Sequence, residues 1–476
     1  MVKPTAKGPR FAYGAGDAGA DVLVAAAGFG SDCDELQPVK IATSAVTSAT
    51  PVRPKPVLRT TAGVCQMAVD DDALPRWRVH GSLYAAAVGE AGVAEVLDRV
   101  DKIADVVRNN ASESERLCQL APPVVDALHE ANLFRLLVPD ELGGMGLTIP
   151  KAGRVFERVS ALDASTGWTL TILNSGAIFA RLLPQETFAT VCRDPRGLIA
   201  GSLNPVTARA EPVNGGYVFT GRATYLSGSA HARWILAAAL VMKDDAPVLA
   251  DGIIQIRCGL MPIDQARSLD TWNVTGMCAT GSTDYEFDHV MVASDWTFEP
   301  FRPRAVTAGD VFSAIPLWAQ LGGLAACAVG AARNMIDRFV ELAATKVPTG
   351  GNFSPLAERA QAHIAVGEAE GLYIAAHAAL IGSVEATWAR GVAAEPFDNE
   401  TLARHRLGSV TATRLAAQAI DLLHDAAGMN AVARDTVLER CWRDVHTMTQ
   451  HIILAPARFE IAGRVLLGQD PGSPVI

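Results

Sequence analysis

The spacing of apolar residues changes twice along the chain. Between residues 91 and 196, apolar residues recur every three or four positions, which is the pattern of amphipathic helices. From residue 197 to 300 the period shortens towards two, and turn residues separate the runs, as in short strands. From residue 301 to 476 helical spacing returns in four long stretches. We therefore predict an α+β protein with an N-terminal helical domain, a middle antiparallel β barrel or sandwich and a C-terminal four-helix bundle.

The same spacing places the individual elements. Helices are expected at Ala94–Asn109, Ser112–Ala131, Lys151–Ser160 and Ser165–Leu183, briefly after Pro184, and at Ala314–Leu342, Ser354–Gly382, Asn399–Gly428 and Val437–Gly468, with Pro456 as a candidate break. Strands are expected at Gly197–Ser202, Thr207–Pro212, Tyr217–Arg222, Trp234–Val241, Gly252–Arg257 and Thr283–Val292. Ser112 and Glu115 fit a helix capping box. Asn214-Gly215 predicts a hairpin turn with positive φ at both positions.

Residues 1–90 differ from the rest of the chain. They are rich in Ala, Gly, Val, Thr and Pro, and the run Pro51–Pro56 is typical of an extended linker. Gly14, Gly16 and Gly19 match a dinucleotide-binding fingerprint, but that motif needs a buried strand before it, and the preceding residues do not form one. We therefore expect a flexible or irregular extension here.

Composition and charge exclude several kinds of partner. The chain has 476 residues, a hydrophobic share of 49% and a net charge of −10, with no run of Lys or Arg. Nucleic acid and anionic membranes are therefore not expected partners. No uninterrupted apolar stretch reaches the length of a membrane span. The eight cysteines form no CxxC pair, which favours reduced, mostly buried thiols in a cytoplasmic protein. No His/Cys cluster has ligand spacing, so no metal is expected.

Three polar segments are candidates for chemistry. In Thr220–Trp234 a strand breaks into a Ser/Gly turn that can present hydroxyls and N–H groups to a flat ligand. An ordinary polar turn without a ligand would have the same sequence pattern. Trp272–Asp284 is a small-residue loop that could cradle a phosphate or a ring, or simply connect two strands. Leu438–His451 mixes charged groups with Trp and Met inside an expected helix instead of separating them by face.

In this order, the three segments and Ala164-Ser-Thr-Gly-Trp168 resemble the acyl-CoA dehydrogenase fold superfamily. More closely they resemble its oxygen-activating branch, the flavin-dependent monooxygenases that receive reduced flavin from a separate reductase. The resemblance covers residues 91–476 and rests on the Ser227-Gly-Ser turn, the W-x-V-x-G-M-x-x-T-G-S loop and the E-R-x-W-R-D-x-H segment.

The resemblance implies where reduced FMN or FAD is held, namely between the β domain and the C-terminal bundle. Ser227 is then expected to hydrogen-bond near flavin N5 and Tyr225 to pack by the ring. The remaining expected cofactor contacts are Trp168, Ser202, Asn204, Gly228, Ser229, Thr280 and Ser282. Trp168 can equally be a core residue.

His451 distinguishes an oxygenase from a dehydrogenase. Many acyl-CoA dehydrogenases place a glutamate base after the Arg-Asp pair, and alignment on Arg443-Asp444 puts Ile452 at that position. Without a carboxylate there, no base is evident for removing a proton from an acyl thioester. A histidine matches the monooxygenases, where it is thought to hydrogen-bond the oxygen adduct on flavin C4a; a histidine that caps a carbonyl or faces solvent is the alternative.

The sequence also departs from that branch. Its members often carry Arg where Cys278 stands, and its phenol hydroxylases carry a His near Leu173–Gly176, where none occurs. We therefore expect a monooxygenase of a small aromatic or heterocyclic molecule, with a reductase as partner and a homotetramer by analogy. An acyl-CoA dehydrogenase-type FAD enzyme and a non-catalytic flavin-binding protein are the alternatives.

Overall fold

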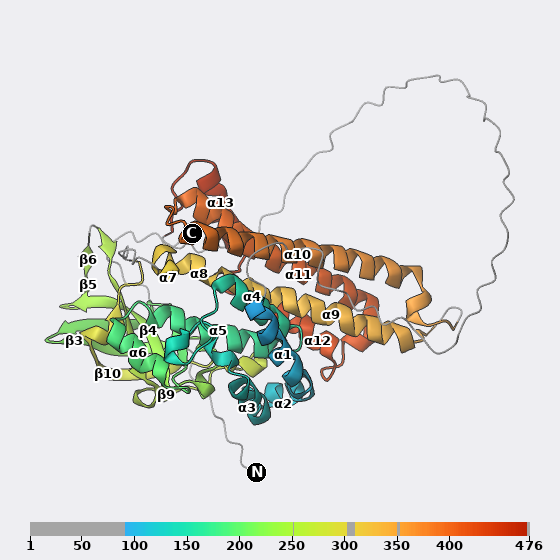
Figure 1. Ribbon diagram of the computed structural model, residues 1–476, viewed down its shortest axis with the longest axis horizontal. Helices are drawn as coiled ribbons and strands as arrows, with labels where there is room; N and C mark the ends of the chain where they lie inside the picture. The colour runs from blue at the N-terminus through green and yellow to red at the C-terminus, as the bar shows by residue number, and fades with distance from the viewer. Residues whose placement is uncertain (1–90, 251, 302–309, 350–352, 474–476) are drawn as a thin grey trace, which may run out of the picture. The chain divides into compact units, whose positions relative to one another are not determined.

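The computed structural model describes residues 91–250, 252–301, 310–349 and 353–473 (Figure 1). The expected extension at 1–90, with its Gly14–Gly19 match, lies outside the described residues. The described part starts with six helices, continues as a sheet and ends in long helices, so the predicted acyl-CoA dehydrogenase-like fold class is confirmed. The domain boundaries themselves stay a prediction.

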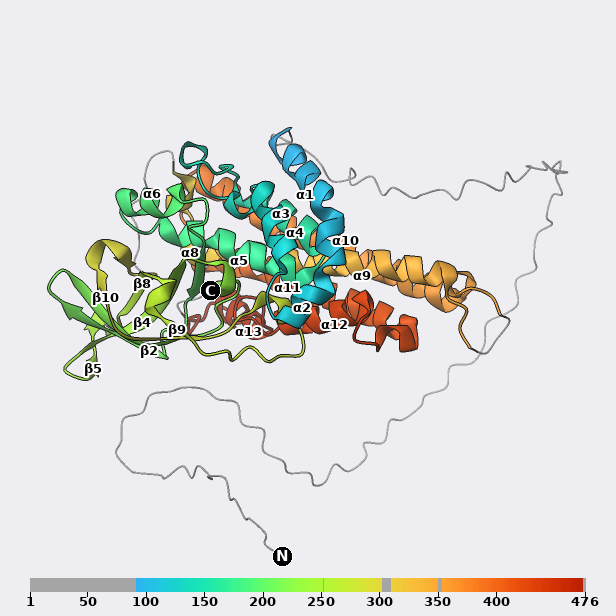
Figure 2. The ribbon, with the colours of Figure 1, turned by 90° about the horizontal axis from the view of Figure 1, so that it is seen from below.

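The N-terminal helices include one almost completely buried helix, α5 (Ala164–Ala180). The others are α1 (Ala91–Asn109), α2 (Ala111–Leu117), α3 (Pro122–Glu130), α4 (Ile149–Ser160) and α6 (Gln185–Arg193). Helix α5 is apolar or small on every face, so it can be covered on all sides. It contacts β1 and α9 and lies between the sheet and the long C-terminal helices (Figure 2). The Asp163 carboxylate begins it by accepting a bond from Thr166 N at 2.8 Å.

The predicted helix Ser112–Ala131 and its capping box are wrong. Cys118 adopts a left-handed conformation with φ 51° and ends α2, and Pro122 starts α3. Asn110 occupies the cap position without a side-chain bond. The two residues of the expected box instead reach α12: Ser112 Oγ accepts from Arg440 at 2.7 Å, and Glu115 pairs with Arg440 at 3.0 Å.

The sheet is mixed, whereas the sequence predicted an antiparallel one. Its main path runs β11–β8–β4–β2–β3–β10–β9. The strands are β1 (Ile199–Ser202), β2 (Ala208–Val213), β3 (Gly216–Ala223), β4 (Trp234–Lys243), β5 (Ala246–Pro247), β8 (Ile256–Pro262), β9 (Arg267–Ser268), β10 (Tyr285–Ala293) and β11 (Thr297–Phe298), with β6 (Leu249–Ala250) and β7 (Ile253–Ile254) as a separate ribbon. β4 pairs in parallel with both β1 and β2. The connection from β3 to β4 passes over β2, so that β4 lies on the other side of β2 from β3 and runs in the same direction as β2.

The hairpin between β2 and β3 forms as predicted, with Val213 opposite Gly216. Only Gly215, at φ 86°, is left-handed there, so the expectation of positive φ at Asn214 is wrong. The crossing connection from β3 to β4 is more important for function, because it carries the Ser227 turn to the end of the sheet that faces α5.

The C-terminal helices differ from the prediction mainly at their starts. They are α7 (Val311–Ala314), α8 (Leu317–Gln320), α9 (Ala325–Thr345), α10 (Ala360–Val392), α11 (Asn399–Ala427), α12 (Val437–Met448) and α13 (Ala457–Leu466). Pro316 divides the expected Ala314–Leu342 helix, since a proline cannot continue one. The last helix breaks at Thr449, before Pro456.

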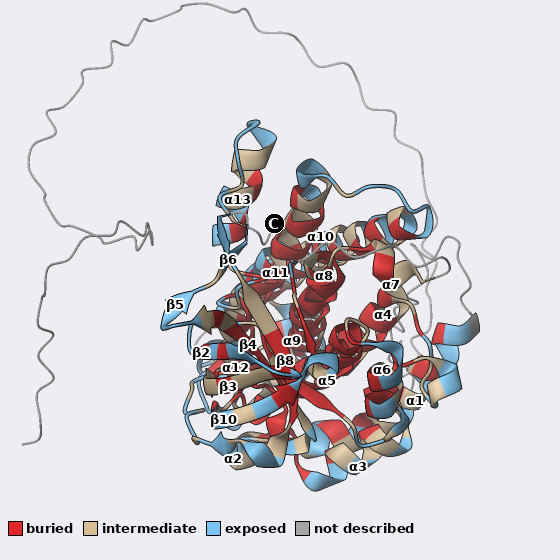
Figure 3. Ribbon diagram, turned by 90° about the vertical axis from the view of Figure 1, so that its left-hand side faces the viewer, coloured by how far each residue is buried: buried red, intermediate tan, exposed pale blue. Residues whose placement is uncertain are grey.

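Helix α9 joins the bundle to the N-terminal helices. It packs against α4, α5, α11 and α12, and most of its residues are buried (Figure 3). Helix α10 is, by length and composition, apolar enough to span a membrane, but it packs along α9 and α11 as a bundle helix. The six cysteines in the described residues are free thiols, four of them buried.

Candidate active site

The turn between β3 and β4 has an unusual backbone. Tyr225 (φ 60°) and Gly228 (φ 72°) are both left-handed, a conformation that costs free energy for a non-glycine residue. A Cβ on Gly228 would lie 3.0 Å from side-chain atoms of Leu173 and Thr169 on α5. The glycine therefore permits the close approach that places the turn against α5.

The Trp272–Asp284 loop lies alongside this turn. Gly228 N donates to Thr280 O at 2.8 Å and Leu226 N donates to Thr283 O at 3.0 Å, so the two loops are joined by backbone bonds. Met277 (φ 59°) and Gly281 (φ 52°) are also left-handed. Strained backbone in two adjoining loops is typical of a functional site.

Four of the residues expected at the site form one buried chain of hydrogen bonds. The indole Nε1 of Trp168 donates to Ser227 Oγ at 3.1 Å. Ser227 Oγ lies 2.7 Å from Ser282 Oγ, which lies 2.6 Å from Thr280 Oγ1. All four side chains are buried. Trp168 is thus both a core residue and a donor at the site.

His451 packs against the ring of Trp168. It follows α12, and its ring meets the Trp168 ring edge to face, with centroids 5.1 Å apart. Ile453 N donates to His451 Nδ1 at 3.3 Å, so in the neutral ring the hydrogen is on Nε2. Nε2 has no partner among the residues that the structure describes.

The surroundings of His451 set its charge state. Burial, together with the guanidinium groups of Arg406 and Arg458, lowers the pKa of His451 to about 4. The imidazole is therefore neutral near pH 7. No carboxylate of the described residues contributes to its shift, and Ile452, at the dehydrogenase base position, is 58% exposed.

The other expected contacts lie around the same turn. Asn204 Nδ2 donates to Thr224 Oγ1 at 3.3 Å, and Asn204 N donates to Ser202 Oγ at 3.4 Å. Tyr225 is 69% exposed and meets Trp272 edge to face. Ser229 is buried, and its hydroxyl donates to Gly281 O at 3.4 Å.

Sequence reasoning missed the groups that hold the loops in place. The buried Asp444 carboxylate of α12 accepts from Met277 N at 2.5 Å. Asp284 accepts from Tyr225 N at 2.9 Å and pairs with Arg222. Both aspartates stand inside the motifs that carried the resemblance, so the signal was present, but spacing alone does not show which backbone each carboxylate holds.

The two departures from the monooxygenase branch now have structural descriptions. Cys278 lies against the guanidinium of Arg443, which also donates to Thr275 O, so α12 supplies a cation beside the loop that lacks one. Asn174 donates to Leu133 O and Leu170 O and accepts from Leu136 N. Because its bonds are used within the helical part, Asn174 cannot replace a histidine that polarises a phenol.

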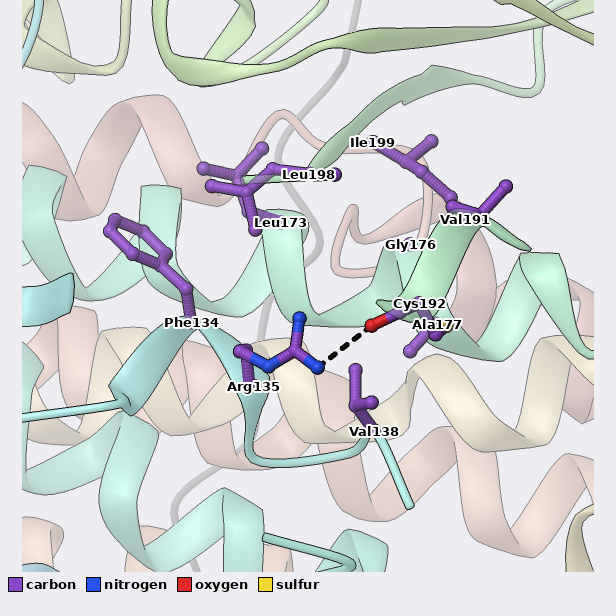
Figure 4. A pocket seen from close by; sticks show the side chains of 11 residues that line it. Phe134, Arg135, Val138, Leu173, Gly176, Ala177, Val191, Cys192, Leu198 and Ile199 are labelled. Atoms are coloured by element: carbon purple, nitrogen blue, oxygen red, sulfur yellow. Dashed lines mark hydrogen bonds between the residues drawn. The ribbon is translucent and has the colours of Figure 1, made fainter. Parts of the chain in front are cut away.

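The cavity in Figure 4 does not bind a cofactor. It has a volume of about 20 Å³, room for one water molecule, and lies between α5, α6 and β1. Arg135 reaches its edge and donates to Cys192 O at 2.7 Å. Burial raises the pKa of the Cys192 thiol to about 11, so the thiol is unreactive.

The residues at the two loops fit a flavin. The polar groups are hydroxyls, an indole and an imidazole, with no carboxylate in the Trp168–Thr280 chain, which suits an uncharged tricyclic ring. Thr169 Oγ1, beside the Gly228 turn, is buried without a hydrogen-bond partner. The glycine and small residues leave the backbone accessible to a flat group.

Comparison with known proteins agrees with this description. Residues 94–183 match the acyl-CoA dehydrogenase N-terminal domain and residues 322–456 match an acyl-CoA dehydrogenase C-terminal domain. The indole-3-acetate monooxygenase of Pseudomonas putida is 29% identical over 385 residues, which are 78% of this chain and 94% of that protein.

Two further relatives belong to the same group. The flavin-dependent monooxygenase oxygenase subunit HsaA of Rhodococcus jostii is 29% identical over 76% of this chain and 95% of its own length. The crystal structure of 3-HSA hydroxylase from Rhodococcus sp. RHA1 has a TM-score of 0.74 and 27% identity, with 80% of this chain and 99% of that chain covered.

The fold, the two domain matches and the site define the class: the described part of the chain has the acyl-CoA dehydrogenase fold and matches both family domains. The relatives that it resembles over most of its length are flavin-dependent monooxygenases.

Proposed function

We propose that this chain is the oxygenase component of a two-component monooxygenase that uses reduced FMN or FAD and O₂ to oxygenate a small aromatic or heterocyclic molecule. The observation that carries the proposal is the neutral His451 imidazole, packed on Trp168, with its Nε2–H free to donate next to the Ser227 hydroxyl chain. The relatives named as monooxygenases support it.

Each residue has a distinct task in this proposal. The bound reduced flavin supplies the electrons that activate O₂. Ser227 and its hydroxyl partners orient the ring, and Trp168 separates them from His451 while it excludes water from both. His451 donates a hydrogen bond from Nε2 and stays neutral across the physiological pH range, so it stabilises developing negative charge without releasing a proton. A dry surrounding strengthens that bond.

The test is product formation with labelled oxygen. The protein is mixed with photoreduced flavin, ¹⁸O₂ and a panel of aromatic and heterocyclic compounds, and products are read by mass spectrometry. We expect one labelled oxygen atom in a product, lost in His451→Ala and kept in His446→Ala. His446 is a matched control because it pairs with Asp421 on α11, at 2.9 Å, outside the site. No label in any product would contradict the proposal.

We also propose a flavin reductase as a partner, a cytoplasmic location and a homotetramer. The name of the 28% identical relative, an oxygenase component of an FADH₂-dependent resorcinol hydroxylase, supports a separate reductase. Ile364 and Ile374 on α10 are exposed by 60% and 47%, with Gly367 and Gly371 between them, so a second copy could cover this face. Light scattering measures the assembly, and Ile374→Glu is expected to shift it to smaller species.

A further inference from the structure

The hydrogen bonds at Ser227 have one possible direction. Thr280 Oγ1 donates its only hydrogen to Met277 O at 2.8 Å, so it accepts from Ser282. Ser282 has then used its hydrogen and must accept from Ser227. Each hydroxyl has one hydrogen, so the hydrogen of Ser227 is committed to Ser282.

The other end of the chain agrees with this direction. An indole N–H can only donate, and Trp168 donates to Ser227 Oγ. Ser227 therefore gives its hydrogen to Ser282, takes one from Trp168 and keeps one lone pair. Towards any further group, Ser227 is an acceptor only.

The hydrogen bonds from Ser227 to Ser282, from Ser282 to Thr280 and from Thr280 to Met277 O form a relay, which ends at the main chain of Met277. Its carbonyl accepts from Thr280 Oγ1 and from Trp272 Nε1 at 3.1 Å, and its N–H donates to Asp444 Oδ1. Met277 is left-handed, and the adjacent Gly276 leaves no room for a Cβ, which would lie 2.2 Å from Arg443 O. Asp444 thus anchors the Met277 backbone, whose carbonyl accepts the last hydrogen bond of the relay.

We propose that Asp444 is a positioning residue that, through Met277, fixes the relay so that Ser227 only accepts a hydrogen bond from the flavin. This inference rests on the proposed function. A reduced flavin carries a hydrogen on N5, whereas an oxidised flavin presents a lone pair there. The relay therefore makes the site prefer the reduced form, because the lone pair of the Ser227 oxygen would face the lone pair of N5 when the oxidised form binds.

The test compares affinities and needs no turnover. Dissociation constants for oxidised and photoreduced FMN and FAD are measured anaerobically by equilibrium filtration. Wild-type protein is expected to bind the reduced form at least about tenfold more tightly. In Ser282→Ala the hydrogen of Ser227 is released and can bond N5 of the oxidised form, so the preference falls by roughly fivefold, the effect of one hydrogen bond.

The Asp444 variants separate positioning from charge. Asp444→Asn keeps an oxygen that accepts from Met277 N and is expected to keep the preference, whereas Asp444→Ala is expected to lose most of it. Ser175→Ala is the matched control, because that buried hydroxyl bonds only Thr171 O in its own helix. If Asp444→Ala fails to fold, Ser282→Ala still tests the relay, whereas a folded Asp444→Ala with the wild-type preference overturns the positioning role of Asp444.

The outcomes distinguish this inference from the proposed function. If wild-type protein binds neither form of either flavin, the proposed function is wrong. If it binds flavin but Ser282→Ala has the same preference as wild type, the relay inference is overturned and the oxygenase proposal stands. A preference that drops equally in Ser175→Ala also overturns the inference.

Discussion

The rings of Trp168 and His451 meet edge to face with centroids 5.1 Å apart and an interplanar angle of 75°. The indole N–H of the same tryptophan bonds Ser227. One side chain of α5 therefore connects the histidine of the C-terminal part with the hydroxyls of the sheet domain, and the site is a property of all three parts.

Loss of the imidazole is expected to uncouple oxygen consumption from product. His451→Ala removes the Nε2 donor next to Trp168, so activated oxygen should leave as hydrogen peroxide. Product per reduced flavin is expected to fall about tenfold or more, with peroxide rising in the same proportion. A peroxidase-coupled assay measures this ratio, and an unchanged ratio would show that His451 does not act on the oxygen.

Buried histidines are expected to make the protein sensitive to mild acid. Burial lowers the pKa of His405 to about 4, as it does for His451. The folded state stays neutral while the unfolded chain takes up protons below pH 6.5, so stability is complete above that pH and falls towards pH 4. For His405 the slope is about 1.4 kcal/mol per pH unit. Urea unfolding at pH 7.5, 6 and 5 measures it, and His405→Gln should flatten the dependence.

Asp444 is expected to have the opposite dependence. Complete burial and the nearby Asp163 raise the pKa of Asp444 to about 7. The folded state keeps a proton that the unfolded chain loses, so this contribution to stability is present below pH 3.8 and disappears as pH rises through 7. The Met277 N–H and Arg443 favour the charged form, but burial and Asp163 outweigh them, so the pKa is raised.

Asp444→Asn cannot ionise and provides the comparison. Its free energy of unfolding, relative to that of wild type, is expected to rise by roughly 1.4 kcal/mol between pH 6 and pH 9, because the folded carboxyl loses its proton over about one pH unit of this range. Denaturant titrations at three pH values give this difference. Parallel pH curves for the two proteins would mean that Asp444 is ionised throughout.

Replacing glycine by alanine is expected to change the stability of the protein in opposite directions at two positions. Gly228→Ala puts a Cβ on a left-handed residue, 3.0 Å from Leu173 and Thr169, and should destabilise the protein by roughly 1–3 kcal/mol. Gly463→Ala adds a Cβ with nothing within 4 Å in α13 and should stabilise by about 0.5–1 kcal/mol. Thermal unfolding compares them; a stabilised Gly228→Ala would contradict the close approach of turn and helix.

The sequence grouped residues that the structure places in contact, whereas it did not predict the pairing of the strands. Trp168, Ser227, Thr280 and Ser282 were expected together, and the structure connects them by hydrogen bonds. The parallel pairing of β2 with β4 was not expected, because periodicity shows that a strand exists but not which neighbour it chooses.

Long-range anchors were equally invisible in the sequence. Ser112 and Glu115 have capping-box spacing, yet they bind Arg440 on a distant helix, which no local pattern reveals. The low pKa of His451 is also hidden from the sequence, because it depends on burial and on the positions of Arg406 and Arg458 in the folded chain.

The bond between Met277 and Asp444 joins residues 167 positions apart in the chain. During synthesis, every hydroxyl of the relay leaves the ribosome long before α12 does. Until α12 has docked, Met277 lacks its carboxylate and the orientation of the Thr280 acceptor is not fixed. The nascent protein therefore acquires its cofactor site among the last steps of folding, and flavin capture reports on completion of the whole chain.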